Sequence, residues 1–377
     1  MKKYLKKIST VYFILRDQVF RKSCLKISNL ESIERAMAWL CNAQDAVQGG
    51  GIATSYDLRK GWLPPFPETT GYIVPTFFDY YHFTKNENYR TRAISMLDWL
   101  LEVQESDGAI SGITEEAKHP LVFDTGQVLF GFIRGYMEVG TELYLYAAQK
   151  AGDWLVRHQD TDGKWSHYVY HGIPHTYHTR VSWALAELYK IVQNHKYTET
   201  AEKNCNWALS HQLKNGWFEQ NYFSPDQPVY THTIAYSARG LLEVGEILHC
   251  EKYLKSAQKV ADVLLTLQRI DGSVPGSFNE KWERTTKSSC LTGIAQFSII
   301  WSRLFEITGD QKYFDAAQKA NRFLVGTQDR STIPKGIRGA IKGSHPIHGN
   351  YLAYVYPNWA AKFFVDALML EHKINKG

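Results

Sequence analysis

A histidine-rich segment stands directly before an apolar helical pattern in the middle of the chain. Residues 175–188, HTYHTRVSWALAEL, place His175, Tyr177, His178 and Arg180 where a helix is expected to begin. A helix start needs a capping residue, which a neighbouring threonine can supply, but it does not need two imidazoles and a guanidinium. Imidazole and phenol groups can carry a proton, and a guanidinium pairs with a carboxylate. The segment therefore predicts proton chemistry beside an acidic ligand.

One motif occurs six times along the chain and predicts how this segment is positioned. The motif is a bulky residue, four further residues, Gln and then usually Asp-Gly or Asn-Gly. Its glutamines are separated by 60, 55, 53, 56 and 60 residues and are Gln44, Gln104, Gln159, Gln212, Gln268 and Gln328. Because Gly after a periodic apolar run ends a helix, each motif predicts the end of a helix followed by a turn.

A second apolar helix is expected after each turn. These helices are predicted to begin at Thr70, Thr125, Thr179, Thr233, Thr292 and Asn358, since Thr and Asn are favourable N-caps. They are apolar on several faces and rich in glycine, which is typical of an inner ring, whereas the first helices carry one apolar stripe. Six such hairpins predict an all-α fold, an (α/α)6 toroid, as a single domain over residues 27–377.

Residues 1–26 differ in composition from the rest of the chain. They hold eight Lys and Arg against one Asp, and their apolar run VYFIL is too short for a signal peptide or a membrane span. We expect this segment to be dispensable for folding, and any role it has to be a salt-sensitive contact with an anionic membrane surface. The remaining chain is slightly acidic and carries no nucleic-acid signature, so no nucleic-acid partner is expected.

The cysteines and histidines show no metal or cofactor pattern. The five cysteines are widely spaced and form no CxxC, which favours a reducing compartment and therefore a cytoplasmic protein, with membrane association only through residues 1–26. His345 and His348 are three residues apart on an expected loop, which is a weak signal for metal ligands. We predict no cofactor and no metal.

The repeat resembles that of the six-hairpin toroid superfamily, over about residues 30–372. This superfamily includes terpenoid cyclases and protein prenyltransferases on one side, and glycosidases, uronate lyases and epimerases on the other. The stretch 336–371, GIRGAIKGSHPIHGNYLAYVYPNWAAKFFVDALMLE, looks like the C-terminal signature of toroid proteins from bacterial surface-polysaccharide gene clusters. The resemblance implies a toroid with a site at one mouth of its central cavity and a role in surface-polysaccharide metabolism.

In such toroids, the residues just before and at the inner-helix starts line the mouth. Here this implies a polar and cationic mouth with the candidate catalytic residues Glu68, Asp124, Tyr177, His178, Tyr230 and His232. Aromatic rings stack on sugars and cations pair with carboxylates, so the substrate-binding candidates are His175, Arg180, Arg338, Lys342, His345, His348, Tyr354, Tyr356, Asn358 and Trp359. The expected substrate is an acidic, uronate-containing saccharide.

Proton abstraction next to the carboxylate, as in a C5-epimerase or lyase, is the chemistry that we favour from these residue types. It requires a base, a neutralising cation and an acid on the opposite face. Neighbouring hairpins supply Tyr177 with His178 and Tyr230 with His232, and Arg180 lies near. The stretch TYHTRVSWAL is also similar, over a short length, to DYHTTHINQL of animal glucuronyl C5-epimerases.

Three alternatives remain open. A glycoside hydrolase would use two carboxylates, for which Glu68 and Asp124 are the candidates, and FDTGQVLFG looks like the inner-helix start of unsaturated-uronide hydrolases. A terpenoid cyclase or prenyltransferase fits the repeat, but no DxDD motif occurs and Cys290 has no zinc-binding companions nearby in the sequence. A non-catalytic glycan-binding toroid is the third alternative.

Overall fold

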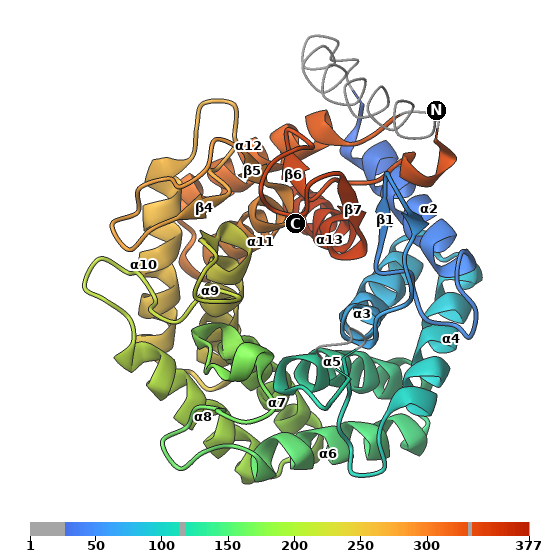
Figure 1. Ribbon diagram of the computed structural model, residues 1–377, viewed down its shortest axis with the longest axis vertical. Helices are drawn as coiled ribbons and strands as arrows, with labels where there is room; N and C mark the ends of the chain where they lie inside the picture. Colours follow the sequence, from blue (N-terminus) through green and yellow to red (C-terminus); the bar gives the residue numbers. More distant parts are fainter. Residues whose placement is uncertain (1–26, 113–117, 331–333, 377) are drawn as a thin grey trace.

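Six helical hairpins form a closed ring around a central opening. The structure is a computed structural model and describes residues 27–112, 118–330 and 334–376. Within these residues, twelve α-helices alternate between an outer and an inner ring (Figure 1). This arrangement confirms the predicted (α/α)6 toroid. The expectations for residues 1–26 fall outside the described residues.

The two rings are built from helices of similar length. The outer helices are α2 (Asn29–Asp45), α4 (Glu87–Val103), α6 (Glu142–Arg157), α8 (His195–Ser210), α10 (Glu251–Leu267) and α12 (Gln311–Thr327). The inner helices are α3 (Pro67–Thr84), α5 (Val122–Val139), α7 (Thr179–Val192), α9 (Thr231–Ile247), α11 (Leu291–Thr308) and α13 (Asn358–Lys376). The inner helices are buried over most of their length, whereas the outer helices bury one face, as the sequence pattern predicts.

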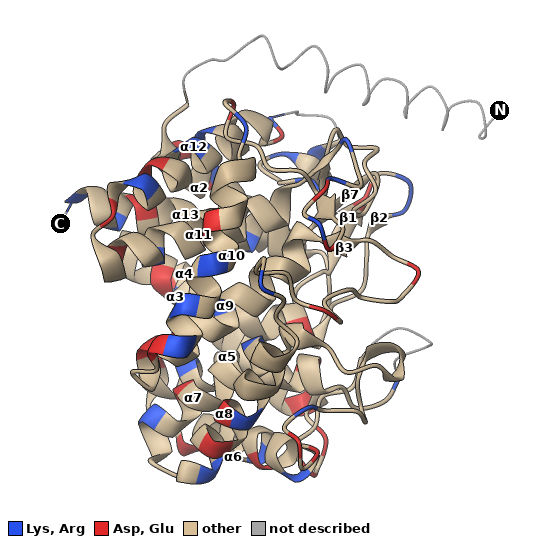
Figure 2. Cartoon of the chain, turned by 90° about the vertical axis from the view of Figure 1, so that its left-hand side faces the viewer, with Lys and Arg blue, Asp and Glu red and all other residues tan. Residues whose placement is uncertain are grey.

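The segments that lead from outer to inner helices gather at one end of the ring (Figure 2). They contain the short helices η3 (Tyr170–Gly172), η4 (Thr176–His178) and η5 (Lys335–Ile337). They also contain the strands β1 (Ser55–Asp57), β2 (Gly61–Trp62), β3 (Val229–Tyr230), β4 (Ser277–Phe278), β5 (Ser289–Cys290), β6 (Ser344–His345) and β7 (Val355–Pro357). Antiparallel pairing gives the order β2-β1-β7 and the pairs β3–β4 and β5–β6. These segments form the mouth of the ring.

The glutamine of each repeat bonds one outer turn to the next outer helix. Gln104 Nε2 donates to the carbonyl of Gly108 in its own turn (3.2 Å) and to the carbonyl of Ala147 in α6 (3.0 Å). The other five glutamines make equivalent pairs of bonds. In the last repeat, Gln328 donates to Ser32 of α2 at 2.9 Å. The same contact therefore closes the ring.

The Asp-Gly that follows the glutamine is required by the shape of this turn. Gly108 has φ of +102°, and a Cβ at this position would lie 2.3 Å from the carbonyl oxygen of Lys150. Only glycine combines this conformation with such close packing. The preceding Asp107 accepts a hydrogen bond from the backbone N–H of Ala109 at 3.1 Å, which is a turn typical of Asp and Asn.

The inner helices approach each other closely through glycine. A Cβ on Gly71 of α3 would lie 2.4 Å from Cα of Val128 in α5, and a Cβ on Gly131 would lie 2.7 Å from the carbonyl oxygen of Gly71. The two helices could not pack in this way with larger residues. The glycine content of these segments is therefore explained by the tightly packed inner ring.

The repeated threonines lie near the inner-helix starts, as predicted, but the prediction that they are N-caps is wrong. The N-cap of α3 is Phe66, which makes no side-chain capping bond. Thr70 lies inside the first turn, donates to the carbonyl of Phe66 (2.8 Å) and accepts from the N–H of Ile52 (3.3 Å). Thr125 bonds to Leu121 and Ile110 in the same way. The hydroxyl thus attaches the preceding turn to the helix.

Candidate active site

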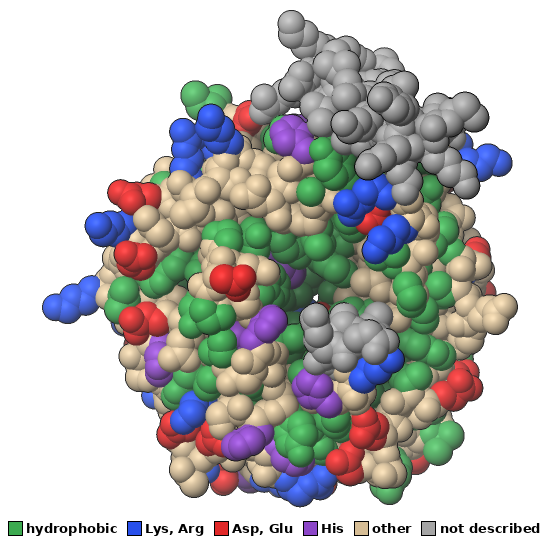
Figure 3. Space-filling view, viewed as in Figure 1, with side chains coloured by type: hydrophobic (Ala, Val, Ile, Leu, Met, Phe, Trp, Pro, Cys, Tyr) green, Lys and Arg blue, Asp and Glu red, His purple; other side chains and the backbone are tan. Residues whose placement is uncertain are grey.

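The mouth of the ring opens into a hollow lined by the first turns of the inner helices. Figure 3 shows that side chains of the hydrophobic class, which there includes tyrosine, and histidines form most of its visible wall. The Lys and Arg side chains visible on this face lie around the rim. The expected cationic mouth is therefore an aromatic one, because the inward-facing residues of the first turns are mainly Tyr, Phe and His.

Two carboxyl groups lie on adjacent inner helices at the base of the mouth. Glu68 is in the first turn of α3 and Asp124 is in the first turn of α5; they are 9% and 0% exposed. Burial raises the pKa of Asp124 to about 7. Burial also raises the pKa of Glu68 well above its ordinary value, and the negative charge of Asp124 adds to this effect. The pair therefore retains a proton near neutral pH.

Tyrosine hydroxyls surround this carboxyl pair. Tyr170 donates to Oδ1 of Asp124 at 3.0 Å, whereas Oδ2 of Asp124 has no hydrogen-bond partner among the described residues. The buried hydroxyl of Tyr177 also lacks a partner among them. Burial raises the pKa of Tyr177, and the charges of Glu68 and Asp124 raise it further. These hydroxyls are therefore neutral donors beside the two acids.

The histidines of the opening segment are buried and neutral. His175 stacks on Tyr177 with ring centroids 4.5 Å apart, and its Nε2 lies 3.1 Å from the carbonyl oxygen of Tyr170. His178 packs against the edge of Trp165 at 5.9 Å, and neither of its ring nitrogens has a hydrogen-bond partner in the described part of the chain. Burial lowers the pKa of His175 to about 4 and that of His178 well below its ordinary value. Both imidazoles therefore lack charge at neutral pH.

Arg180 lies in the first turn of α7, and its guanidinium is inside a cage of aromatic rings. Its Nε donates to Oε1 of Gln127 at 2.6 Å. The guanidinium carbon is 5.0–5.6 Å from the ring centroids of Tyr72, Phe130, Trp183, Tyr236 and Phe363, a geometry that stabilises a cation. Arg180 forms no ion pair within the described residues, and its charge acts on Glu68 by lowering the pKa of that carboxyl.

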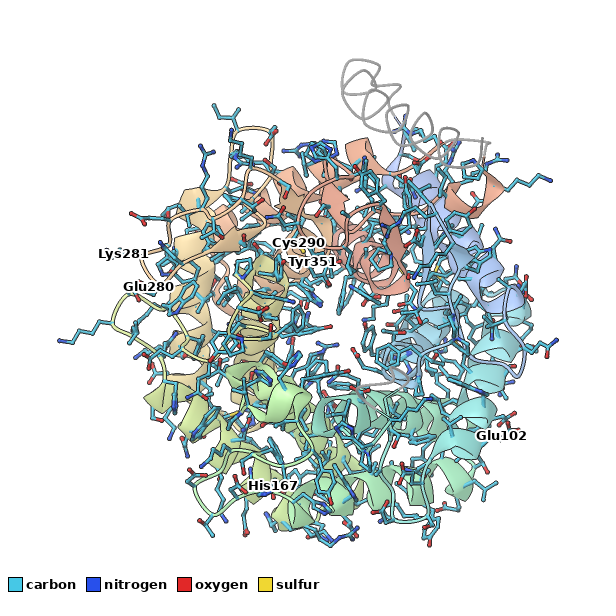
Figure 4. All side chains as sticks on the ribbon, in the orientation of Figure 1. Glu102, His167, Glu280, Lys281, Cys290 and Tyr351 are labelled. Atoms are coloured by element: carbon cyan, nitrogen blue, oxygen red, sulfur yellow. The ribbon has the colours of Figure 1, made fainter. Side chains whose placement is uncertain are left out.

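Tyr230 lies just before α9, the inner helix next to α7, and His232 lies in the first turn of α9. His232 Nδ1 is 2.6 Å from Nε2 of Gln296, and its ring lies 4.3 Å from that of Tyr236. Burial, assisted by the charge of Arg180, lowers the pKa of His232 to about 3. Tyr230 packs with Cys290 and Tyr351, and Figure 4 shows the latter two together beside the central opening.

Cys290 is a packing residue in this arrangement, because burial raises the pKa of its thiol to about 12. Trp359, a predicted binding residue, donates from Nε1 to the hydroxyl of Tyr351 at 2.9 Å. Tyr351 and Trp359 therefore form part of the same wall of the hollow as Tyr230.

Several predicted substrate-binding residues instead hold the mouth segments together. The hydroxyl of Tyr356 donates to Asp329 at 2.8 Å and its ring is fully buried. Asn358 donates from Nδ2 to the carbonyl of Ala53 (3.0 Å) and to Thr69 (2.9 Å). The hydroxyl of Tyr356 and the Nδ2 group of Asn358 are therefore used within the fold, whereas Oδ1 of Asn358 is buried without a hydrogen-bond partner among the described residues.

The other predicted loop residues lie on the segment between α12 and α13, in different surroundings. Lys342 is buried and Arg338 is exposed just after η5. Tyr354 is half-buried beside β7, with φ of +65°. His345 and His348 line a separate pocket at the rim. The structure therefore brings together Glu68, Asp124, His175, Tyr177, His178, Arg180, Tyr230, His232 and Trp359, and places His345 and His348 in the rim pocket instead.

The sequence reasoning missed a deeper layer of the site. Tyr72 and Tyr236 follow Glu68 and His232 by four residues, and Gln127 follows Asp124 by three. On a helix, these spacings place side chains on the same face, so this layer could have been found by extending each mouth position one turn inward. Tyr170 comes from an irregular connection, where no such periodicity exists.

Neither a metal cluster nor a membrane span is found in the part of the chain that the structure describes. No group of three or more His, Cys, Asp or Glu among these residues is arranged to hold a metal ion. No helix among them is long and apolar enough to cross a membrane.

Solved structures of carbohydrate enzymes share this ring. An unsaturated glucuronyl hydrolase specific for heparin superimposes with a TM-score of 0.73 at 15% identity, over 92% of this chain and 97% of that one. A D-mannose isomerase superimposes with a TM-score of 0.71 at 13% identity, over 92% of this chain and 97% of that one. At these identities, the likeness establishes the fold alone.

Sequence comparison identifies a relative and a family. Lanosterol synthase erg7A of Aspergillus fumigatus is 25% identical over 228 residues, which are 58% of this chain but only 28% of that relative. The family model described as the beta-L-arabinofuranosidase GH127 catalytic domain matches residues 23–320. Because this match spans most of the chain, the protein belongs to the GH127 catalytic-domain family and is a carbohydrate-active enzyme of the six-hairpin type.

Proposed function

We propose that this enzyme hydrolyses a glycosidic bond next to an acidic sugar, with Glu68 and Asp124 as its acid/base pair. The observation that carries this proposal is the burial of both carboxyl groups together, on the first turns of adjacent inner helices, with no cation bonded to either among the described residues. Glycoside hydrolysis requires such a pair of carboxyl groups. Membership of a family named for a glycosidase supports the same reaction.

The pKa directions favour this pair over the histidines that the sequence suggested as bases. A general acid or base is most effective when its pKa lies near the working pH. The pKa of Asp124 is about 7, whereas that of His232 is about 3 and that of His178 lies well below its ordinary value. The histidines are therefore weak bases in this environment, while the carboxyl pair can hold and release a proton.

The proposed reaction assigns one role to each acid. Protonated Glu68 donates its proton to the glycosidic oxygen as the bond to the anomeric carbon breaks. Ionised Asp124, which the Tyr170 hydroxyl supports, accepts a proton from water as the water oxygen bonds to that carbon. The water supplies the hydrogen and hydroxyl of the two products, so the atoms balance.

The acidic character of the substrate is inferred from Arg180. Its buried guanidinium is close enough to Glu68 to lower the pKa of that carboxyl and has no carboxylate bonded to it among the described residues, so its positive charge favours an anionic group in the hollow. The similar fold of a heparin-specific glucuronyl hydrolase supports an acidic saccharide. The C-terminal signature at 336–371 supports a role in bacterial surface-polysaccharide metabolism.

A direct assay separates hydrolysis from the alternatives. The enzyme is incubated with uronate-containing oligosaccharides in deuterated water, and new reducing ends, unsaturated uronides and deuterium at C5 are all measured. We expect reducing ends without unsaturated product, and their loss by roughly two to four orders of magnitude in Asp124→Asn and Glu68→Gln. Turnover that survives both substitutions would refute the proposed pair.

Proton abstraction remains the second candidate, because of one specific observation. The Tyr177 hydroxyl and both ring nitrogens of His178 are buried without a hydrogen-bond partner among the described residues, so they are available to a ligand. In the assay above, deuterium incorporation at C5 without chain cleavage would favour an epimerase, and unsaturated uronide would favour a lyase.

A further inference from the structure

A second concave site lies at the rim of the mouth, outside the central hollow. It is a pocket of about 500 Å³ between the segment that precedes α11 and the loop that precedes α13. This volume is within the range of small-ligand pockets. Its wall includes Arg269, Lys287, His345 and His348, and the described residues that line it include no Asp or Glu.

The strand pair β5–β6 separates this pocket from the hollow. Ser289 pairs with His345, and Cys290 pairs with Ser344. Because side chains alternate between the two faces of a strand, Ser289 and His345 face one side and Cys290 and Ser344 the other. Ser289 and His345 line the rim pocket, whereas Cys290 packs with the aromatic wall of the hollow. The two sites are therefore neighbours that share a wall.

The basic side chains of the pocket are accompanied by neutral hydrogen-bonding groups. Arg269 donates from Nη1 to the hydroxyl of Ser273 at 3.2 Å, and this hydroxyl in turn donates to Asp271 at 2.6 Å, which orients the guanidinium. Asn350 and several serine and threonine hydroxyls complete the lining. Such groups donate to the oxygens of an anion and to the hydroxyls of a sugar.

The fifth repeat also differs from most of the others in the residue that follows its glutamine. Arg269 directly follows the repeat glutamine, where four of the other five repeats carry Asp45, Glu105, Asp160 and Asp329. A basic residue at this position is therefore particular to the hairpin that forms the pocket.

We propose that the rim pocket binds an anionic group carried on a saccharide, as a second subsite for an acidic glycan that also enters the central hollow. The anionic group is a carboxylate, sulfate or phosphate, all of which present oxygens to Arg and Lys. The link to the hollow rests on the proposed function; anion binding in the pocket does not.

Binding to the full chain by calorimetry tests this proposal. The ligands are an acidic uronate tetrasaccharide, a neutral tetrasaccharide and inorganic phosphate, and the variant is Lys287→Gln. The matched control is Lys281→Gln, an exposed lysine of the same segment that Figure 4 shows at the outer edge of the ring. We expect Lys287→Gln to weaken the affinity for the acidic tetrasaccharide by about tenfold and to leave the affinity for the neutral tetrasaccharide unchanged. The control variant should bind both ligands like the wild type.

The outcomes distinguish the two proposals. Unchanged affinity of Lys287→Gln for the acidic tetrasaccharide would overturn the rim subsite. If inorganic phosphate binds as tightly as that tetrasaccharide and loses affinity in Lys287→Gln, the occupant is a free phosphate and the glycan subsite is wrong. If Asp124→Asn keeps full turnover while Lys287→Gln still weakens binding, the acid/base pair is wrong and the subsite stands.

Discussion

The hydroxyl of Tyr170 donates a hydrogen bond to Oδ1 of Asp124 at 3.0 Å and so joins the third hairpin to the second. Burial raises the pKa of Asp124, and this bond opposes the effect by stabilising the ionised carboxylate. One tyrosine from an irregular connection therefore partly offsets the effect of burial on the charge of a candidate catalytic residue.

Replacing Tyr170 tests whether its hydroxyl lowers the pKa of Asp124. In Tyr170→Phe the ionised form of Asp124 loses its donor, so the pKa of the carboxyl should rise further. We expect the acidic limb of the kcat/KM profile to move to higher pH, because that limb reports the ionisation of the base in the free enzyme. A Tyr168→Phe variant serves as control, since Tyr168 is exposed. A lower rate with an unmoved pH profile would contradict this role.

The buried acid should also make stability depend on pH. Asp124 has a pKa of about 7 in the folded protein, against an ordinary value of 3.8, so the folded state binds its proton more tightly than the unfolded state. The resulting stabilisation is present below pH 3.8 and is lost as pH rises towards 7. Asparagine resembles the protonated acid, so Asp124→Asn should raise Tm by a few degrees at pH 8 and change it little at pH 4. A lower Tm at both pH values in calorimetry would contradict this expectation.

The charge of Arg180 should affect acidic substrates selectively. We expect Arg180→Met to raise KM for an acidic oligosaccharide by tenfold or more, on the order of 2 kcal/mol, and to leave neutral saccharides unaffected. Arg180→Lys should restore the interaction only in part, because lysine cannot reproduce both the bond to Gln127 and the stacking against the rings. Equal losses for acidic and neutral ligands would instead show that Arg180 only packs the core.

The contact that closes the ring should contribute to stability. In Gln328→Ala, the carbonyls of Ser32 and Gly339 lose their side-chain donor. We expect the free energy of unfolding to fall by roughly 1–3 kcal/mol, as measured by urea denaturation. Gln311→Ala is the matched control, because Gln311 is exposed and bonds only to Asp315 among the described residues. Equal stability of the two variants would argue against a closing role.

The ring could be predicted from the sequence because its contacts repeat. Gln104 and Gln328 perform the same task in different hairpins, so the task leaves a regular spacing in the chain. The capping role given to Thr70 was wrong because its hydroxyl bonds to the preceding turn at Ile52. Sequence spacing locates such a residue, but it does not identify the partner of its hydroxyl.

Part of the candidate site was also predictable from the sequence. Glu68 and Asp124 were found because they lie two residues and one residue before the repeated threonines Thr70 and Thr125, whereas Tyr170 lies in an irregular connection that carries no repeated motif. Tyr356 was expected to bind substrate, but a buried phenol can serve either a ligand or the fold, and here its hydroxyl bonds to Asp329. Partners distant in the sequence decide between these uses.

The glutamine contacts bear on which parts of such enzymes can vary in sequence and length. Each contact joins an outer turn to the next outer helix. In four repeats the second bond of the glutamine reaches only four residues along the chain, so the glutamine makes no bond to the rest of the segment that leads to the inner helix. Those segments carry the mouth of the site, so they can lengthen, shorten or exchange side chains while the frame of the ring is preserved. A glucuronyl hydrolase and a mannose isomerase built on the same ring are what this separation of frame and chemistry would produce.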